Sequence, residues 1–134
     1  MTATRSSGNC EPSEIPFLAI DHVQLAMPPG GEPAGREFYA GILGMTEIAK
    51  PEALAGRGGC WFCSGTVELH LGVQNDFHAA TKAHPALRCA NYEQLTARIR
   101  QAGVTLTEAT EIPGVRRCHL VDPFGNRIEL VALG

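Results

Sequence analysis

The sequence has no stretch of about 20 consecutive apolar residues, the length that a helix needs to cross a bilayer. Residues 1–16 are polar, contain proline and lack the apolar run of a secretory signal. Basic residues are not in excess either, because 11 Lys and Arg stand against 14 Asp and Glu, for a net charge of -3. Such a chain has no basic field to attract phosphate backbones. We therefore expect a cytoplasmic protein that binds neither membranes nor nucleic acid.

Disulfide and zinc-ribbon patterns are missing as well. The five cysteines are an odd number, which favours free thiols over a disulfide framework in a chain without an export signal. Cys60 and Cys63 have CxxC spacing, but neither a second pair nor a following helical pattern accompanies them. In a strand, their sulfurs point to opposite faces. We interpret both as structural residues.

Two segments alternate aliphatic residues with residues that can bind a metal. Along residues 66–73 the aliphatic side chains share one face of a predicted strand, whereas Glu68 and His70 share the other. Residues 127–131 repeat this pattern around Glu129. One face suits a core and the other suits chemistry, and the repetition indicates two copies of one unit.

The predicted elements also occur in the same order twice. Residues 17–73 predict a strand, a helix and three strands, at 17–27, 34–43, 45–49, 59–64 and 66–73. After a polar linker, the same order is predicted at 84–89, 92–102, 104–109, 115–121 and 127–133. Asn91 stands where it can cap the second helix. The prediction is an α+β fold of two tandem βαβββ modules.

This organisation gives one domain over residues 17–134, behind a flexible N-terminal tail over residues 1–16. The modules span about 17–73 and 84–133, and the linker spans 74–83.

The spacing of candidate ligands supports the repeat. His22 precedes Glu68 by 46 residues, and His84 precedes Glu129 by 45. Each pair takes its members from the first and last predicted strands of its module. Internal repetition of this kind favours two structurally equivalent halves.

Four short motifs carry a family resemblance, namely residues 22–25, 38–45, 67–69 and 122–130. Together they make the chain resemble the vicinal oxygen chelate superfamily, which includes glyoxalase I, fosfomycin-resistance proteins, extradiol dioxygenases and bleomycin-resistance proteins. The resemblance covers about residues 17–133. It implies two modules whose curved mixed sheets surround a cavity that holds one divalent metal ion.

Carried over residue by residue, the resemblance implies metal ligands at His22, Glu68, His84 and Glu129. Imidazole and carboxylate suit Fe, Mn, Ni, Co or Zn as divalent ions, and the sequence does not choose among them. His70 shares the face of Glu68, so it is an alternative ligand, an outer partner of a ligand or a substrate contact.

His119 is a further candidate site residue. If the strands around Phe124 pair symmetrically, His119 stands opposite Glu129 on one face. Ring-cleaving dioxygenases of the superfamily often carry an acid-base group in this region, which implies a catalytic or substrate-binding role.

The leading functional interpretation is a glyoxalase-like enzyme that binds a small substrate through two neighbouring oxygens. It would transfer a proton as an isomerase or lyase, with Glu129, Glu68 or His119 as the group that moves the proton. The alternatives are an extradiol-type dioxygenase, a thiol transferase, and a metal-free protein that binds a drug or metabolite.

The resemblance also implies a homodimer with shared metal sites. His22 and Glu68 of one chain would then face His84 and Glu129 of the other, and two-fold symmetry would give two equivalent sites.

Overall fold

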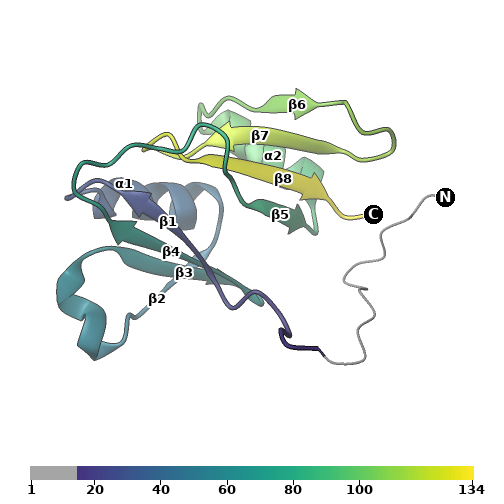
Figure 1. Cartoon of the computed structure of the whole chain (residues 1–134). Coiled ribbons are helices and arrows are strands. Elements are labelled where there is room, and N and C mark those ends of the chain that lie inside the picture. Colours follow the sequence, from purple (N-terminus) through teal and green to yellow (C-terminus); the bar gives the residue numbers. More distant parts are fainter. Residues whose placement is uncertain (1–14) are drawn as a thin grey trace.

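The computed structural model describes residues 15–134 of the chain. Residues 1–14, with most of the expected tail and Cys10, lie outside the described residues. Each half of the chain forms a four-stranded sheet, and in Figure 1 the green and yellow sheet of the second half lies above that of the first. Within the described part, no helix is long and apolar enough to cross a membrane.

The first module has the strand order β1-β4-β3-β2. Its strands are β1 (Val23–Met27), β2 (Thr46–Ile48), β3 (Cys60–Ser64) and β4 (Val67–Val73). Its helical segments are α1 (Glu32–Arg36), the π-helix η1 (Glu37–Ile42) and the 3-10 helix η2 (Glu52–Arg57). Strands β1 and β4 are parallel, and the other two pairs are antiparallel.

The second module repeats this arrangement with the strand order β5-β8-β7-β6. Its elements are β5 (Ala86–Cys89), α2 (Tyr92–Gln101), β6 (Thr107–Ala109), β7 (Arg117–Val121) and β8 (Arg127–Ala132). Again the first and last strands of the module are parallel, and the other pairs are antiparallel. The predicted α+β fold of two βαβββ modules is confirmed.

The core lies on one face of each sheet. Leu69 and Leu71 of β4, and Ile128 and Leu130 of β8, are buried in one hydrophobic cluster that also contains Ile99 of α2. Because strand side chains alternate between faces, the residues between these aliphatics point away from the core. The candidate site residues of β4 and β8 lie on that other face.

A buried polar contact joins the two modules. Asp122, in the turn between β7 and β8, accepts a hydrogen bond of 2.7 Å from the hydroxyl of Tyr39 in η1. It also accepts bonds from the backbone of Phe124 and from the side chain of Asn126. The same Asn126 amide donates to the carbonyl of Ala26 in β1 at 2.8 Å. The turn of one module is therefore anchored in the other.

The first strand is shorter than expected. The sequence pattern predicts a strand over 17–27, but β1 begins at Val23, where its pairing with β4 starts. Without a neighbouring strand, the described segment before β1 has no regular secondary structure. Its large apolar side chains at Phe17, Leu18 and Ile20 are between 78% and 92% exposed.

The predicted cap of the second helix is also wrong. Asn91 occupies the N-cap position of α2, but its side chain does not accept a bond from the first turn of the helix. Its amide instead donates to the side-chain oxygen of Gln94 at 2.8 Å. The predicted free thiols, by contrast, are confirmed for the four cysteines in the described residues.

Candidate metal centre

Three donor side chains meet on the open face of the second sheet. One nitrogen each of His84 and His119 and a carboxylate oxygen of Glu129 lie within 4.8 Å of one another. Nε2 of His84 is 2.9 Å, and Nε2 of His119 is 3.4 Å, from Oε1 of Glu129. In residues 15–134, no other three His, Cys, Asp or Glu side chains come so close together. Their side chains are 13% to 23% exposed, so the cluster is accessible but partly desolvated.

Strand pairing accounts for part of this cluster. His119 on β7 stands directly opposite Glu129 on β8, as symmetrical pairing around Phe124 predicts. His84 lies just before β5, and its Nδ1 donates to the backbone carbonyl of Lys82 at 2.8 Å. A neutral His84 therefore turns its Nε2 lone pair toward the carboxylate oxygen.

Two lone pairs facing each other need a cation or a second proton between them. Two ligand atoms that lie at right angles and about 2.1 Å from an ion are about 3.0 Å apart. The 2.9 Å between His84 and Glu129 fits that geometry. The residues present therefore suit a divalent metal ion.

Arg117 completes the surroundings of Glu129 and was not among the site residues predicted from the sequence. Its Nη1 donates to Oε2 of Glu129 at 3.2 Å, and its Nη2 donates to Glu111 at 2.9 Å. Burial raises the pKa of Glu129, but hydrogen bonds from His84, in its doubly protonated form, and from Arg117 outweigh the effect of burial and leave the pKa lowered. Glu129 is thus an anion at neutral pH. The period-two spacing of Arg117 and His119 on one strand was the signal that could have identified it.

The candidate residues of the first module form a separate group. The ring of His70 is stacked between Trp61, at 3.7 Å and 2°, and His22, at 4.1 Å and 16°. Nε2 of His70 is 2.7 Å from Oε2 of Glu68. His70 is only 3% exposed, whereas Glu68 is half-buried and His22 is exposed, with its Nδ1 2.9 Å from Asp21. This module therefore brings His22, His70 and Glu68 together.

The two groups do not form one site within a single chain. Across the residues that the structure describes, no set of three close donors combines residues of both modules. The four expected ligands are thus divided, with His22 and Glu68 in one group and His84 and Glu129 in the other.

The strand register changes the alignment of the two halves. The sequence pattern aligns Glu68 with Glu129. In the sheets, however, Gln24 of β1 pairs with His70, and Ala86 of β5 pairs with Glu129. By register, the counterpart of Glu129 is therefore His70, and the sequence-based alignment is shifted by two residues.

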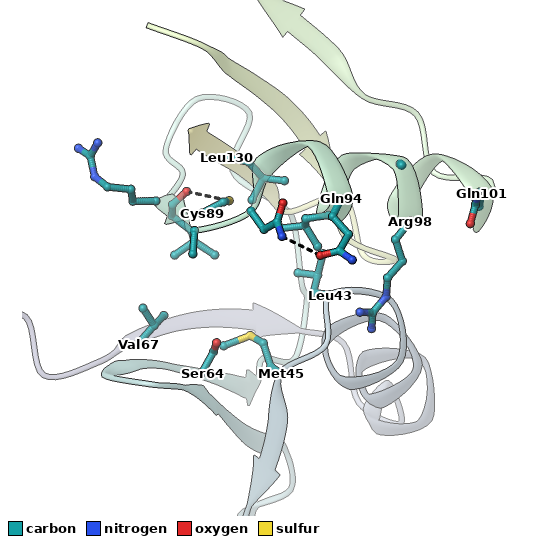
Figure 2. A pocket seen from close by; sticks show the side chains of 15 residues that line it. Leu43, Met45, Ser64, Val67, Cys89, Gln94, Arg98, Gln101 and Leu130 are labelled. Carbon is teal, nitrogen blue, oxygen red and sulfur yellow. Dashed lines mark hydrogen bonds between the residues drawn. The ribbon is translucent and has the colours of Figure 1, made fainter. Parts of the chain in front are cut away.

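Two clefts lie between parts of the two modules. One of about 470 Å³ includes His84 in its wall, together with Gln24 of β1 and Arg127 of β8. A larger cleft of about 630 Å³ separates α2 from the first module, and in Figure 2 Gln94 and Arg98 lie on the opposite side from Met45, Ser64 and Val67. None of the candidate ligands lines the larger cleft.

Comparison with known proteins gives one family and several similar structures. The model of the Glyoxalase/Bleomycin resistance protein/Dioxygenase superfamily matches residues 19–130. A glyoxalase family protein from Bacillus anthracis is 40% identical, with 90% of this chain and 99% of that chain covered and a TM-score of 0.87. No protein in the curated set matches the chain.

Two more distant structures share the fold. The fosfomycin resistance protein FosX from Listeria monocytogenes is 18% identical, with 88% of this chain and 95% of that chain covered and a TM-score of 0.70. An antibiotic binding protein from a Streptomyces species is 22% identical, with 88% and 100% covered and a TM-score of 0.66. One FosX structure is a complex with Mn(II) and a dihydroxypropylphosphonic acid.

Proposed function

Because the chain belongs to the glyoxalase/bleomycin resistance protein/dioxygenase superfamily, we propose that it is a metal-dependent enzyme of the glyoxalase type. The observation that supports this most is the convergence of His84, His119 and Glu129 on the open face of the second sheet. The proposed substrate is a small molecule with two neighbouring oxygens. The proposed reaction is a proton transfer of the isomerase or lyase type.

His22, His84 and Glu129 would hold a divalent ion, with Glu68 or His70 as the fourth ligand. Iron, manganese, nickel, cobalt and zinc all suit imidazole and carboxylate ligands. Mn(II) is the first ion to test, because it is present in the FosX complex. Such an ion would supply Lewis acidity to the two substrate oxygens.

The proton-transfer roles fall to residues around Glu129. His119 is 3.4 Å from Glu129 and partly exposed, and an imidazole can both accept and donate a proton through its ring nitrogens. It could therefore hold a proton and pass it to a substrate in the adjacent space. Arg117 fixes the second oxygen of Glu129 and so orients the carboxylate. Glu68 is the other candidate base.

We also infer a homodimer in which the first module of one chain meets the second module of the other. The donor groups of the two modules are separate within one chain, so a second copy could bring them together. The segment just before His22 exposes apolar surface that a partner could cover, at Phe17, Leu18 and Ile20. Two-fold symmetry would produce two equivalent sites.

Calorimetric titration of metal-free protein tests the proposal. We expect about one Mn(II), Fe(II), Ni(II), Co(II) or Zn(II) per chain for at least one of these ions. The variants His84→Ala and Glu129→Ala should lose binding while circular dichroism reports an intact fold. Glu52→Ala, which removes an exposed carboxylate from η2, is the control and should bind as the wild type does. Absence of binding by the wild type above background would refute the proposal.

A metal-free binding protein is the second candidate. Arg117 and His84 already contact both oxygens of Glu129, so the cluster is satisfied in part without an ion. The similar antibiotic binding protein also makes this class relevant. Elemental analysis of protein purified without chelator discriminates the two, since only the enzyme should retain a stoichiometric metal.

The dioxygenase and thiol transferase alternatives share the metal with the leading proposal. Oxygen consumption with a catechol would indicate the first, and transfer of a thiol to an electrophile would indicate the second.

A further inference from the structure

We propose that His70, rather than Glu68, is the metal ligand that the first module contributes from its last strand, and that Glu68 positions the His70 imidazole. The inference rests on the proposed metal-dependent function and makes its site more specific.

The register of the parallel strands is the first argument. In the first module, His22 lies two residues before Gln24, and Gln24 pairs with His70 of the last strand. In the second module, His84 lies two residues before Ala86, and Ala86 pairs with Glu129 of the last strand. Because residues at equal places in equivalent sheets project from the same face, His70 and Glu129 have equivalent positions.

The antiparallel neighbours give the same alignment independently. Trp61 of β3 pairs with His70, and His119 of β7 pairs with Glu129. Both arguments exclude Glu68 as the equivalent of Glu129. The site residues of the two modules are therefore His22, His70 and Trp61 on one side, and His84, Glu129 and His119 on the other.

The contacts of His70 are those of a metal-binding histidine whose second ring nitrogen is hydrogen-bonded to a carboxylate, here that of Glu68. Its Nε2 is 2.7 Å from Oε2 of Glu68, so a proton shared there leaves a lone pair on Nδ1. Histidines that bind metals commonly give their other ring nitrogen to a carboxylate in this way. If Glu68 turned to bind the ion, it would leave a nitrogen of the nearly buried His70 without this partner, which is unfavourable.

The inference changes the expected charge of the site. Three neutral imidazoles, from His22, His70 and His84, and the single carboxylate of Glu129 leave one positive charge on a divalent ion. Two carboxylates would have neutralised it. A site with one positive charge favours anionic substrates, such as carboxylates or phosphonates with a neighbouring hydroxyl group.

Three variants and a matched control test the assignment. His70→Gln removes the imidazole with little loss of volume, His70→Glu makes the first module match the second, and Glu68→Gln removes the carboxylate charge. Leu69→Val is the control, because Leu69 is equally buried on the same strand but faces the core. Each protein is titrated with Mn(II) by calorimetry, and pulsed electron paramagnetic resonance counts the imidazole nitrogens bound to the ion.

The expected result is a loss of Mn(II) affinity of about 100-fold or more in His70→Gln, with one coordinated imidazole fewer. His70→Glu should bind Mn(II) within about tenfold of the wild type, but it should bind oxalate at the loaded site at least about tenfold more weakly. Glu68→Gln should lose about 10-fold to 100-fold in affinity, with the number of coordinated imidazoles unchanged. Leu69→Val should bind as the wild type does.

The opposite pattern overturns the assignment. If Glu68→Gln removes binding while His70→Gln keeps the wild-type affinity and imidazole count, Glu68 is the ligand. If neither change matters but His84→Ala removes binding, the second module holds the ion alone, and the proposed function survives without this inference. If the wild type binds no ion, both fail.

Discussion

Asp122 forms a buried polar contact between the two modules. It is 3% exposed and accepts bonds from Tyr39, Phe124 and Asn126. Burial raises the pKa of the Tyr39 phenol, and the nearby Asp122 carboxylate raises it further. The phenol therefore keeps its proton in the folded protein at pH values where an unfolded tyrosine, with a pKa of about 10, loses it.

The sign of the resulting pH dependence follows from this difference. The contribution of Tyr39 to the free energy of unfolding is complete below about pH 10 and falls by about 1.4 kcal/mol for each further pH unit. Tyr39→Phe should remove this part of the alkaline slope and, at pH 7, cost about 1.5 to 3 kcal/mol through the lost bond to a charged acceptor. Urea denaturation at pH 7 measures the lost bond, and a series between about pH 9 and pH 11 measures the slope.

Tyr92→Phe is the control for that experiment. Burial also raises the pKa of Tyr92, but in the described structure its hydroxyl donates no hydrogen bond to a charged acceptor. Tyr92→Phe should similarly reduce the loss of the free energy of unfolding above pH 10, but it should lower that free energy less than Tyr39→Phe does at pH 7. An unchanged slope in Tyr39→Phe would contradict the argument.

At the scale of elements, the first helical segment contains two glycines with different surroundings. A side chain added at Gly41 in η1 would meet no atom within 4 Å, whereas one added at Gly35 in α1 would lie 2.6 Å from a methyl group of Leu71. Gly41→Ala should therefore raise the free energy of unfolding by about 0.4 to 1 kcal/mol, and Gly35→Ala should lower it by about 1 to 3 kcal/mol. Thermal melts of the pair measure the difference, and the reverse order would refute it.

The elements also explain what the sequence could and could not predict. All eight strands fall within their predicted ranges, although β1 occupies only the end of its range, because each sheet buries one face against the core and so imposes an alternating pattern. The contact of His119 with Glu129 was predictable, since a short turn fixes the register of an antiparallel pair. The parallel register of β1 and β4 was not, because a long connection with five other elements separates them. The choice between Glu68 and His70 depends on that register.

Contacts between the modules were likewise beyond the sequence pattern. Nothing in the local sequence relates Tyr39 to Asp122, which lie 83 residues apart. The exposed segment before β1 is a second example. Its apolar residues are visible in the sequence, but the sequence does not show whether another strand lies beside them.

At the scale of the whole molecule, each module carries only part of the proposed metal-ligand set. The proposed homodimer with shared sites can therefore be tested by mixing variants. When His22→Ala and Glu129→Ala are mixed and their subunits exchange, a heterodimer has both defects in one shared site and a complete second site. Random mixing should restore metal binding to about a quarter of the wild-type level, because half of the dimers carry one intact site of two.

A second mixture controls for nonspecific recovery. His84→Ala and Glu129→Ala both lie in the second module, so every shared site of their heterodimer keeps one defect. This mixture should show no recovery. If the first mixture also shows none although exchange is demonstrated, the sites are built within single chains.

The stacking of Trp61 on His70 gives the protein an intrinsic optical signal. Trp61 is the only tryptophan in the chain, and its indole lies 3.7 Å from the His70 ring at an interplanar angle of 2°. Nearly all fluorescence excited at long ultraviolet wavelengths therefore originates from an indole in contact with a candidate ligand. A proton or a paramagnetic ion reaching that imidazole would alter the emission directly, so rapid-mixing experiments can follow events in the first module in unlabelled protein.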